Sequence, residues 1–133
     1  MKTSYLKKTA ILILLIIMSF TFQSCLVSRC KRPQIVGYVY DSITRKPIEN
    51  CKVGESLTDI KGYFRLKELR YSEFAFVGSE APPLMVDEPV YKENYEKKSI
   101  KLFNKFGSGI RKGSLHDADT IFLKRNVITT DYK

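Results

Sequence analysis

Histidine is rare in the sequence and tryptophan is absent. His116 is the only histidine, and no tryptophan occurs among the 133 residues. A zinc site or a Ser-His catalytic pair built on several histidines is therefore excluded. Asp117 and Asp119 lie beside His116, but the glycine-spaced ladder of acids that binds calcium is missing, so we interpret these residues as a solvated turn before the last strand. We expect no catalytic residue, no metal and no cofactor, and hence no enzyme.

Acidic residues are missing from the first 24 positions, which contain three lysines. Residues 25–133 carry 20 Lys and Arg against 14 Asp and Glu, a net charge of +6. This mild and dispersed excess favours contact with anionic surfaces. The sequence has neither the basic and aromatic motif of an RNA-binding sheet nor a recognition-helix pattern, so nucleic acid is not expected as a partner.

A hydrophobic run long enough to span a membrane comfortably is also missing. Ala10–Met18 is apolar throughout, whereas a spanning helix needs about 20 apolar residues. Lys7-Lys8 before this run and the small residue Ser24 after it are typical of a secretory signal, which we place at residues 1–24. The alternative is an uncleaved signal anchor that extends to Val27 and buries Cys25.

Short β-rich runs alternate with turn residues between Ile35 and Leu66. Asp41 and Asp59 each follow an extended run, where a short carboxylate can accept backbone N–H groups two residues on. Pro47 presets φ just before the next run, and Gly62 can supply the positive φ of a hairpin turn. The pattern predicts a β-meander.

The same spacing resembles the carboxypeptidase regulatory-like domain, a small transthyretin-like β-sandwich of bacterial envelope proteins. The family pattern is carried here by Gly37, Val39, Asp41, Thr44, Pro47, Thr58, Asp59, Gly62 and Phe64. Arg45 stands where the family has a turn glycine, and Asn50-Cys51 replaces Gly-Ala, although Asn tolerates the left-handed region and Cys is small and buriable. The resemblance implies an all-β fold, an antiparallel transthyretin-like or Ig-like sandwich of about seven strands, without catalytic residues of its own.

The strand pattern continues toward the C-terminus. We expect strands at 35–40, 50–53, 57–58, 63–66, 73–79 and 120–124, and a strand along a sheet edge at 84–90. Phe74 and Phe76 are expected inside the sandwich. Residues 91–106 fit either a helix or a strand, and family analogy favours a strand at 99–103. The domain thus spans residues 35–125, between a tether at 25–34 and a polar tail at 126–133.

Phe22-Gln23-Ser24-Cys25 resembles the lipobox of bacterial lipoproteins, in the loose form found in Bacteroidetes-type signals. The resemblance implies that Cys25 becomes the acylated N-terminus, whose palmitate-like chains hold the protein on a lipid bilayer. The inner-membrane retention Asp and the acidic surface-export cluster are both missing after Cys25. By analogy we expect the periplasmic face of the outer membrane, with surface exposure left open.

Two cysteines remain once Cys25 is acylated. An oxidising periplasm permits a disulfide between Cys30 and Cys51, which would close a loop of about 20 residues and contribute roughly 3 kcal/mol. The alternative is that Cys51 fills a small core position and Cys30 is a free thiol on the tether.

The segment 97–112 contains no acid and forms a candidate binding patch. Tyr91 and Tyr95 are expected to be exposed beside it, because Tyr suits interfaces. The patch is either a binding site or an ordinary solvated face. Its basic residues are Lys97, Lys98, Lys101, Lys105, Arg111 and Lys112.

Two functions fit these observations. The first is a non-catalytic binding or structural module for a periplasmic or outer-membrane protein, engaged through loops or an exposed sheet edge. The alternative is a carrier or binder of a small anionic or glycan ligand, held by the basic segment 97–112.

Overall fold

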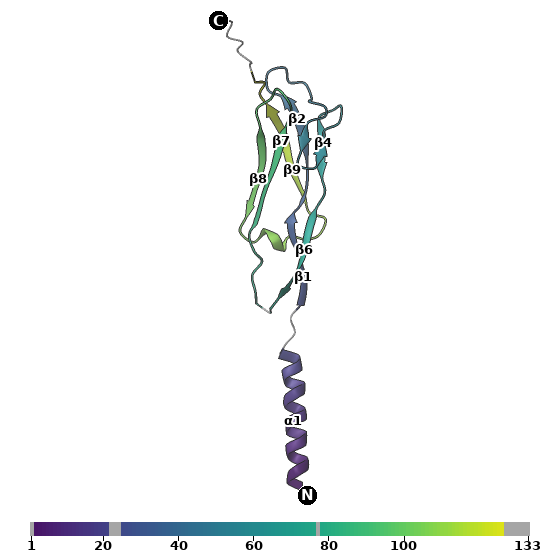
Figure 1. The fold of residues 1–133 in the computed structure, drawn as a ribbon, viewed down its shortest axis with the longest axis vertical. Coiled ribbons are helices and arrows are strands. Elements are labelled where there is room, and N and C mark those ends of the chain that lie inside the picture. The colour runs from purple at the N-terminus through teal and green to yellow at the C-terminus, as the bar shows by residue number, and fades with distance from the viewer. Residues whose placement is uncertain (1, 22–24, 77, 127–133) are drawn as a thin grey trace. The chain divides into compact units, whose positions relative to one another are not determined.

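The computed structural model describes residues 2–21, 25–76 and 78–126 (Figure 1). Apart from one α-helix and one short 3₁₀ helix, its regular elements are β-strands, which confirms the all-β fold class. The chain forms two compact units. The first comprises Met1–Val27 and Ser72–Glu80, and the second comprises Ser28–Tyr71 and Ala81–Lys133.

The first unit contains helix α1, Lys2–Thr21, the first residues of strand β1, Cys25–Arg32, and the last residues of strand β6, Leu69–Ala75. Within the described part of the chain, no helix combines the length and the apolar character that crossing a membrane requires. Residues 22–24 of the predicted lipobox, the side chain of Cys25 and positions 127–133 of the predicted tail lie outside the described residues.

The second unit contains the remaining strands and the 3₁₀ helix Gly107–Gly109. The strands predicted at 35–40, 63–66 and 99–103 are confirmed, with ends that shift by one residue at most. The strand bounds are β2 Gln34–Asp41, β3 Lys52–Val53, β4 Ser56–Leu57, β5 Tyr63–Leu66, β7 Leu84–Tyr91, β8 Lys98–Asn104 and β9 Leu115–Leu123.

The described strands form three sheets. One has the strand order β5-β2-β9, a second has the order β4-β3-β7-β8, and β1 pairs with β6 in the third. The three-stranded and four-stranded sheets together have the seven strands expected for the sandwich. The expectation of an antiparallel sandwich is corrected at one pair, because strand β9 runs parallel to β2. A parallel pair needs a long crossover, and here the chain passes through the second sheet between β2 and β9.

One hydrophobic cluster joins the inner faces of the three-stranded and four-stranded sheets. On β2 the side chains alternate, so that Ile35 and Val39 are fully buried while Tyr38 between them is exposed. Phe64 on β5 and Val90 on β7 belong to the same cluster. The two sheets therefore form a sandwich around a common core.

Both predicted aspartate turns are present. The Oδ1 of Asp41 accepts the backbone N–H of Ile43 at 2.8 Å, and that of Asp59 accepts the N–H of Lys61 at 2.8 Å. Gly62 has a φ of 74°, as the hairpin turn requires. These contacts join residues close in sequence, which is why the local pattern predicted them.

Two residues at which the sequence differs from the pattern of the family it resembles have a left-handed backbone. Asn50 adopts the left-handed region with a φ of 53°, as predicted. Arg45, at the expected turn glycine, has a φ of 56°, and its guanidinium lies 4.4 Å from the ring centroid of Phe122. Thr58 is buried, and its hydroxyl donates to the Ile48 carbonyl at 2.6 Å.

Gly37 permits a β-bulge between β2 and β9. The register between these strands shifts there, and Asp119 has a φ of 57°. A Cβ on Gly37 would lie 2.8 Å from the Asp119 carbonyl oxygen and 3.0 Å from the ring of Phe64. Only glycine leaves room for both neighbours.

The tether expected at residues 25–34 is wrong, because residues 25–32 form β1. Cys30 and Arg32 on this strand are buried. The polar sequence of this segment indicated a tether, because the partners that neutralise Arg32 lie far along the chain, as described below.

The prediction that Phe74 and Phe76 lie inside the sandwich is also wrong. Strand β6 ends at Ala75, and the two phenylalanine side chains are 73% and 75% exposed. β6 pairs with β1 in a sheet of two strands, and the two phenylalanines take no part in the core cluster.

The strand at 84–90 is present as β7, but it is not an edge strand. β7 lies between β3 and β8. The carbonyl of Pro89 accepts the N–H of Gly54, just past the end of β3. Because β3 has already ended there, the missing N–H of Pro89 breaks no ladder within the paired segment.

Candidate binding surface

Strand β8 forms an edge of the four-stranded sheet, and β7 is its only neighbour among the described strands. Pro89 on β7 lies opposite Ser99 on β8. The N–H of Gly54 donates to the Pro89 carbonyl at 2.8 Å from the β3 side. Since the N–H and C=O of one strand residue point to the same side, Pro89 faces β3, and its pair with Ser99 is of the non-hydrogen-bonded type.

The two types of pair alternate along an antiparallel ladder, so Lys101 and Phe103 also belong to non-hydrogen-bonded pairs. The backbone N–H and C=O groups of Ser99, Lys101 and Phe103 therefore point away from β7. No described strand lies hydrogen-bonded on that side. The edge of β8 thus presents a row of backbone groups that can pair with another strand.

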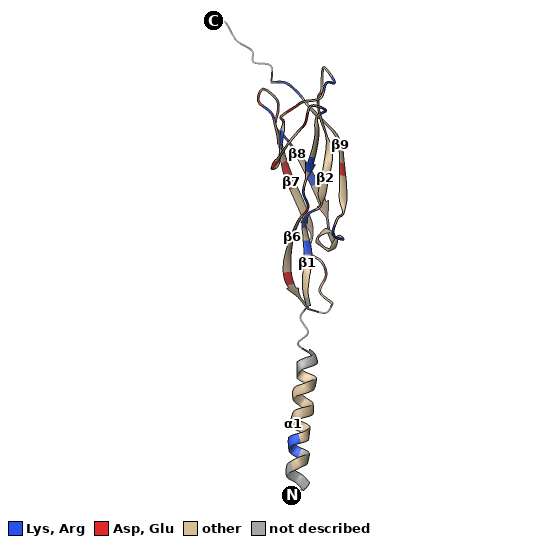
Figure 2. Ribbon diagram, turned by 90° about the vertical axis from the view of Figure 1, so that its right-hand side faces the viewer, with Lys and Arg blue, Asp and Glu red and all other residues tan. Residues whose placement is uncertain are grey.

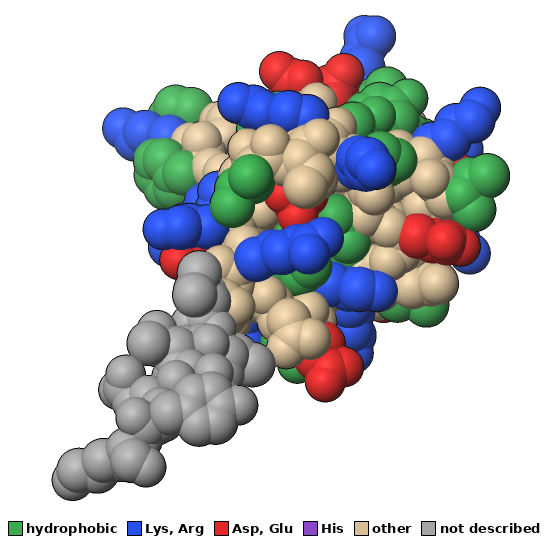
Figure 3. Space-filling view, turned by 90° about the horizontal axis from the view of Figure 1, so that it is seen from above, with side chains coloured by type: hydrophobic (Ala, Val, Ile, Leu, Met, Phe, Trp, Pro, Cys, Tyr) green, Lys and Arg blue, Asp and Glu red, His purple; other side chains and the backbone are tan. Residues whose placement is uncertain are grey.

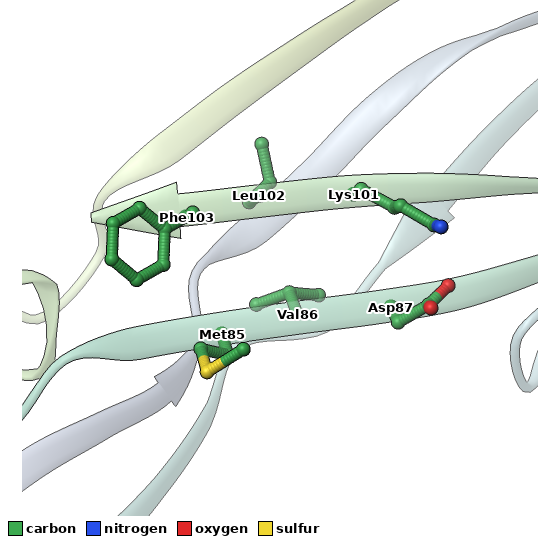
Figure 4. A pocket seen from close by; sticks show the side chains of 6 residues that line it. All are labelled: Met85, Val86, Asp87, Lys101, Leu102 and Phe103. Atoms are coloured by element: carbon green, nitrogen blue, oxygen red, sulfur yellow. The ribbon is translucent and has the colours of Figure 1, made fainter. Parts of the chain in front are cut away.

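The outer face of β7 and β8 carries an apolar pair followed by a charged pair. Met85 lies opposite Phe103 and Asp87 lies opposite Lys101. Figure 4 shows the Phe103 ring beside Met85 at one end and Lys101 beside Asp87 further along the strands. Met85 and Phe103 are 75% and 71% exposed, and the two pairs line a hollow of about 390 Å³.

The structure divides the predicted basic patch among several segments. All six of its Lys and Arg side chains are exposed. Those before Gly107 lie on β8 or within two residues of its ends, whereas Arg111 and Lys112 lie beyond the 3₁₀ helix. The first group consists of Lys97, Lys98, Lys101 and Lys105.

Two of these lysines rest against aromatic rings. The Nζ of Lys97 lies 5.4 Å from the ring centroid of Tyr91, and that of Lys105 lies 5.3 Å from the centroid of Phe106. Tyr91 is exposed, as predicted. In the space-filling view of Figure 3, Lys and Arg side chains are likewise spread between hydrophobic and acidic ones on the visible face.

The expectation that Tyr95 is exposed beside the basic segment is wrong, because Tyr95 is partly buried and takes part in a polar network around Asp41. Its hydroxyl donates to Asp41 Oδ2 at 3.0 Å, and Arg125 Nε donates to the same oxygen at 2.8 Å. The N–H of Thr44 contributes most to lowering the pKa of Asp41, burial opposes it, and Ile43, Tyr95 and Arg125 add to it. Both carboxylate oxygens of Asp41 therefore accept two hydrogen bonds each, and we assign this residue a structural role.

Sequence reasoning missed Arg32, which is 3% exposed. Its guanidinium donates to both carboxylate oxygens of Glu55, to Glu88 Oε1 at 2.6 Å, and to the carbonyl of Lys67 at 2.8 and 3.2 Å. Burial alone would lower the pKa of Arg32, but the hydrogen bonds to Glu55 and Glu88 raise it. These partners are 23 to 56 residues away, so no local pattern shows them.

Strand β9 replaces the solvated turn expected at His116, Asp117 and Asp119. The bulge at Asp119 interrupts the alternation of side chains, which hid the strand in the sequence. β9 forms an edge of the three-stranded sheet, and a hollow of about 300 Å³ lies between β8 and β9. Near one end of the two strands, the Glu96 N–H donates to the Lys124 carbonyl at 2.8 Å.

Cys30 and Cys51 are both free and buried, so the disulfide is not formed in the structure. Both belong to the core cluster. Burial raises the pKa of the Cys51 thiol to about 11, and Lys92 partly offsets the rise. Burial also raises the pKa of Cys30, against the opposing charge of Arg70.

The described residues therefore bring together an edge strand, an apolar pair and a charged pair on one side of the sandwich. Sequence reasoning singled out Lys101 but missed Met85 and Phe103, because the register that joins them is not local. Among the described residues, no group of three or more His, Cys, Asp or Glu is placed to hold a metal ion. Comparisons with protein-family models, with curated proteins and with solved structures find no match to this chain.

Proposed function

We propose that this protein is a lipid-anchored outer-membrane lipoprotein, facing the periplasm, whose sandwich is a non-catalytic binding module for an envelope protein. The lipobox-like segment ending at Cys25 supports the anchor. The aspartate turns and the left-handed Arg45 and Asn50 support a carboxypeptidase regulatory-like sandwich. The observation that carries the binding function is the edge of β8 with which no strand in the described ranges pairs.

An extended segment of the partner would add to the sheet beside β8. Its backbone would pair with the N–H and C=O groups of Ser99, Lys101 and Phe103. Its side chains would then alternate between the two faces of the sheet. On the outer face, an apolar residue would lie beside Phe103 and an acidic residue two positions away would lie beside Lys101. We therefore expect the partner segment to combine apolar and acidic residues at a spacing of two.

The small-ligand alternative has less support from the geometry. Lys101 faces Asp87 across the two strands, and Lys97 and Lys105 rest on separate rings. Arg111 and Lys112 lie in another segment. The cations therefore do not converge on one point, as an anion site requires.

Site-specific photo-crosslinking in intact cells tests the proposal. A photoreactive phenylalanine analogue replaces Ser99 on the free edge of β8, and a matched control carries it at Arg65. Arg65 is exposed on β5, an edge strand of the other sheet. We expect a discrete crosslinked product from position 99 that is absent from position 65.

Charge reversal makes the test specific. Lys101→Glu should reduce the crosslinked product about tenfold, because like charges directly opposite each other on neighbouring strands disfavour pairing. Lys61→Glu, in the exposed turn before β5, should leave the product unchanged. Equal products from positions 99 and 65, or a product that survives Lys101→Glu, would contradict strand addition at β8.

A further inference from the structure

Outside helix α1, the first unit exposes three large apolar side chains on the strands β1 and β6 or directly after them. Leu26, Phe74 and Phe76 are 64%, 73% and 75% exposed. Leu26 directly follows Cys25 on β1, Phe74 lies on β6, and Phe76 follows the last residue of β6. Single exposed apolar residues are common, but two phenylalanines spaced by two on one short segment mark a surface that contacts something apolar.

The contacts between β1 and β6 show which ends of the strands meet. Arg32 Nη2 donates to the Lys67 carbonyl at 2.8 Å, and Arg70 Nη2 donates to the Ser28 carbonyl at 3.0 Å. The partner on β1 changes from Arg32 back to Ser28 as the other partner changes from Lys67 forward to Arg70. Opposite directions of this kind are those of an antiparallel pair. Figures 1 and 2 both draw the two strands side by side. The first residues of β1 therefore lie beside the last residues of β6.

We propose that Leu26, Phe74 and Phe76, here called the tip, insert into the interfacial region of the lipid bilayer that the acyl chains of Cys25 enter. The inference rests on the lipid anchor of the proposed function. An acylated Cys25 brings the bilayer to the start of β1, and the tip is the apolar surface beside that point. Phenylalanine and leucine are the residues with which peripheral proteins enter this layer.

The charge along β1 agrees with a membrane as the occupant. Arg29 and Lys31 follow on the same strand, and β1 has basic segments and no acidic ones in Figure 2, whereas the paired strand β6 carries one acid, Glu73, directly before Phe74. At about 3.3 Å per residue, these positions are within reach of the headgroup layer when Leu26 lies at its boundary. Basic residues at this depth are attracted by anionic headgroups.

The tip would give the anchor a second, directional contact. Acyl chains hold a protein at the bilayer but leave its orientation free, whereas inserted side chains of a two-stranded sheet fix the angle of that sheet to the membrane. The tip thereby limits the directions that the ribbon of β1 and β6 can take.

The absence of tryptophan makes the proposal directly measurable, because one introduced tryptophan is the only indole in the protein. The variants Phe74→Trp and Phe76→Trp are isolated from bacterial membranes as the mature protein. They are reconstituted into phosphatidylethanolamine and phosphatidylglycerol vesicles, with and without lipids brominated on the upper acyl chain. Phe103→Trp is the matched control, since Phe103 is 71% exposed but lies on β8.

We expect blue-shifted emission from both tip variants, and brominated lipids should remove roughly half of it, since interfacial apolar side chains lie about 5–10 Å into the boundary layer. Phe103→Trp should show neither change. Unshifted emission from the tip variants overturns the inference. So does a blue shift without quenching, which would place the tip against protein, such as a second copy of the chain.

The mass of the N-terminal peptide from the same sample reports acylation of Cys25 separately. A peptide without acyl chains contradicts the anchor in the proposed function, while the quenching still decides whether the tip meets lipid. An acylated peptide with unquenched tip variants overturns the inference and leaves the anchor intact. The two failures are therefore distinguishable.

Discussion

At the scale of single residues, Gly62 has the strictest steric requirement among the turn residues. Its φ is +74°, and a Cβ there would lie 2.5 Å from the Val39 carbonyl oxygen. Gly113 has a similar φ of +81°, but a Cβ at that position would meet nothing within 4 Å. Comparing substitutions at Gly62 and Gly113 therefore separates two contributions to stability, that of the left-handed backbone and that of crowding around the Cβ.

We predict that Gly62→Ala lowers the free energy of unfolding by roughly 3 kcal/mol, because the left-handed backbone costs about 1–2 kcal/mol and the clash forces the backbone to shift. Gly113→Ala should cost about 1–2 kcal/mol, the backbone term alone. Urea unfolding of the two variants and the wild type measures both values. Equal losses would show that crowding by Val39 has no part in the choice of glycine.

The residue-level predictions succeeded where the partners are close in sequence. The turn of Asp41 with Ile43 and the left-handed Asn50 follow from short-range stereochemistry. The second oxygen of Asp41 is different, since it binds Arg125, which is 84 residues away. No propensity or spacing indicates a contact of that range, so the role of Tyr95 in this network was also missed.

At the scale of elements, the last residue of β1, Arg32, connects this strand with distant parts of the second unit, to which Arg32 itself belongs. The five N–H groups of the Arg32 guanidinium are all used, by Glu55, Glu88 and the carbonyl of Lys67. This connects β1 with the turn between β3 and β4 and with β7. Besides the pairing of β1 with β6, one buried cation therefore fastens the strand.

We predict that Arg32→Met destabilises the fold by about 2–4 kcal/mol. Removing one partner of a buried pair leaves the other uncompensated, although here Glu55 is 55% exposed and can be resolvated, which limits the loss. Lys31→Met is the matched control, because Lys31 is exposed on the same strand, and it should change stability by less than about 0.5 kcal/mol. Chemical denaturation compares the two, and similar losses would contradict a fastening role for Arg32.

Strands could be predicted where buried and exposed residues alternate regularly along the sequence. They were misplaced where their position depends on which strands pair with each other. Residues 34–41 and 63–66 alternate buried and exposed positions, so their strands could be read from the sequence. The central place of β7 is compatible with Pro89 because β3 ends at Val53, opposite Val90, so that Pro89 meets Gly54 just past the end of β3. This is a property of the pairing. Likewise Phe74 and Phe76 looked like core residues because the sequence does not show that β6 pairs with β1 alone.

At the scale of the whole molecule, the two buried cysteines report on how the fold holds together. Cys30 lies on β1 and Cys51 lies just before β3, yet both belong to the core cluster of the sandwich. Their pKa values are raised by burial, that of Cys51 to about 11. A raised pKa in the folded state means that the folded protein still binds the thiol proton at a pH where the unfolded chain has lost it. The contribution of these thiols to the free energy of unfolding is therefore fully present below the ordinary thiol pKa of about 8.5, and it falls as pH rises from there toward 11.

We therefore predict that a maleimide labels neither thiol of the native protein at about pH 7.5, and that both become reactive together as urea unfolds the core. Peptide masses after labelling at each urea concentration follow Cys30 and Cys51 separately, and complete labelling in high urea confirms that both are free thiols. Joint labelling would show that β1 belongs to the cooperative unit of the sandwich. Labelling of Cys30 at a lower urea concentration would show the reverse: β1 opens while the core stays folded, and the ion pairs of Arg32 do not bind the strand into a single cooperative fold.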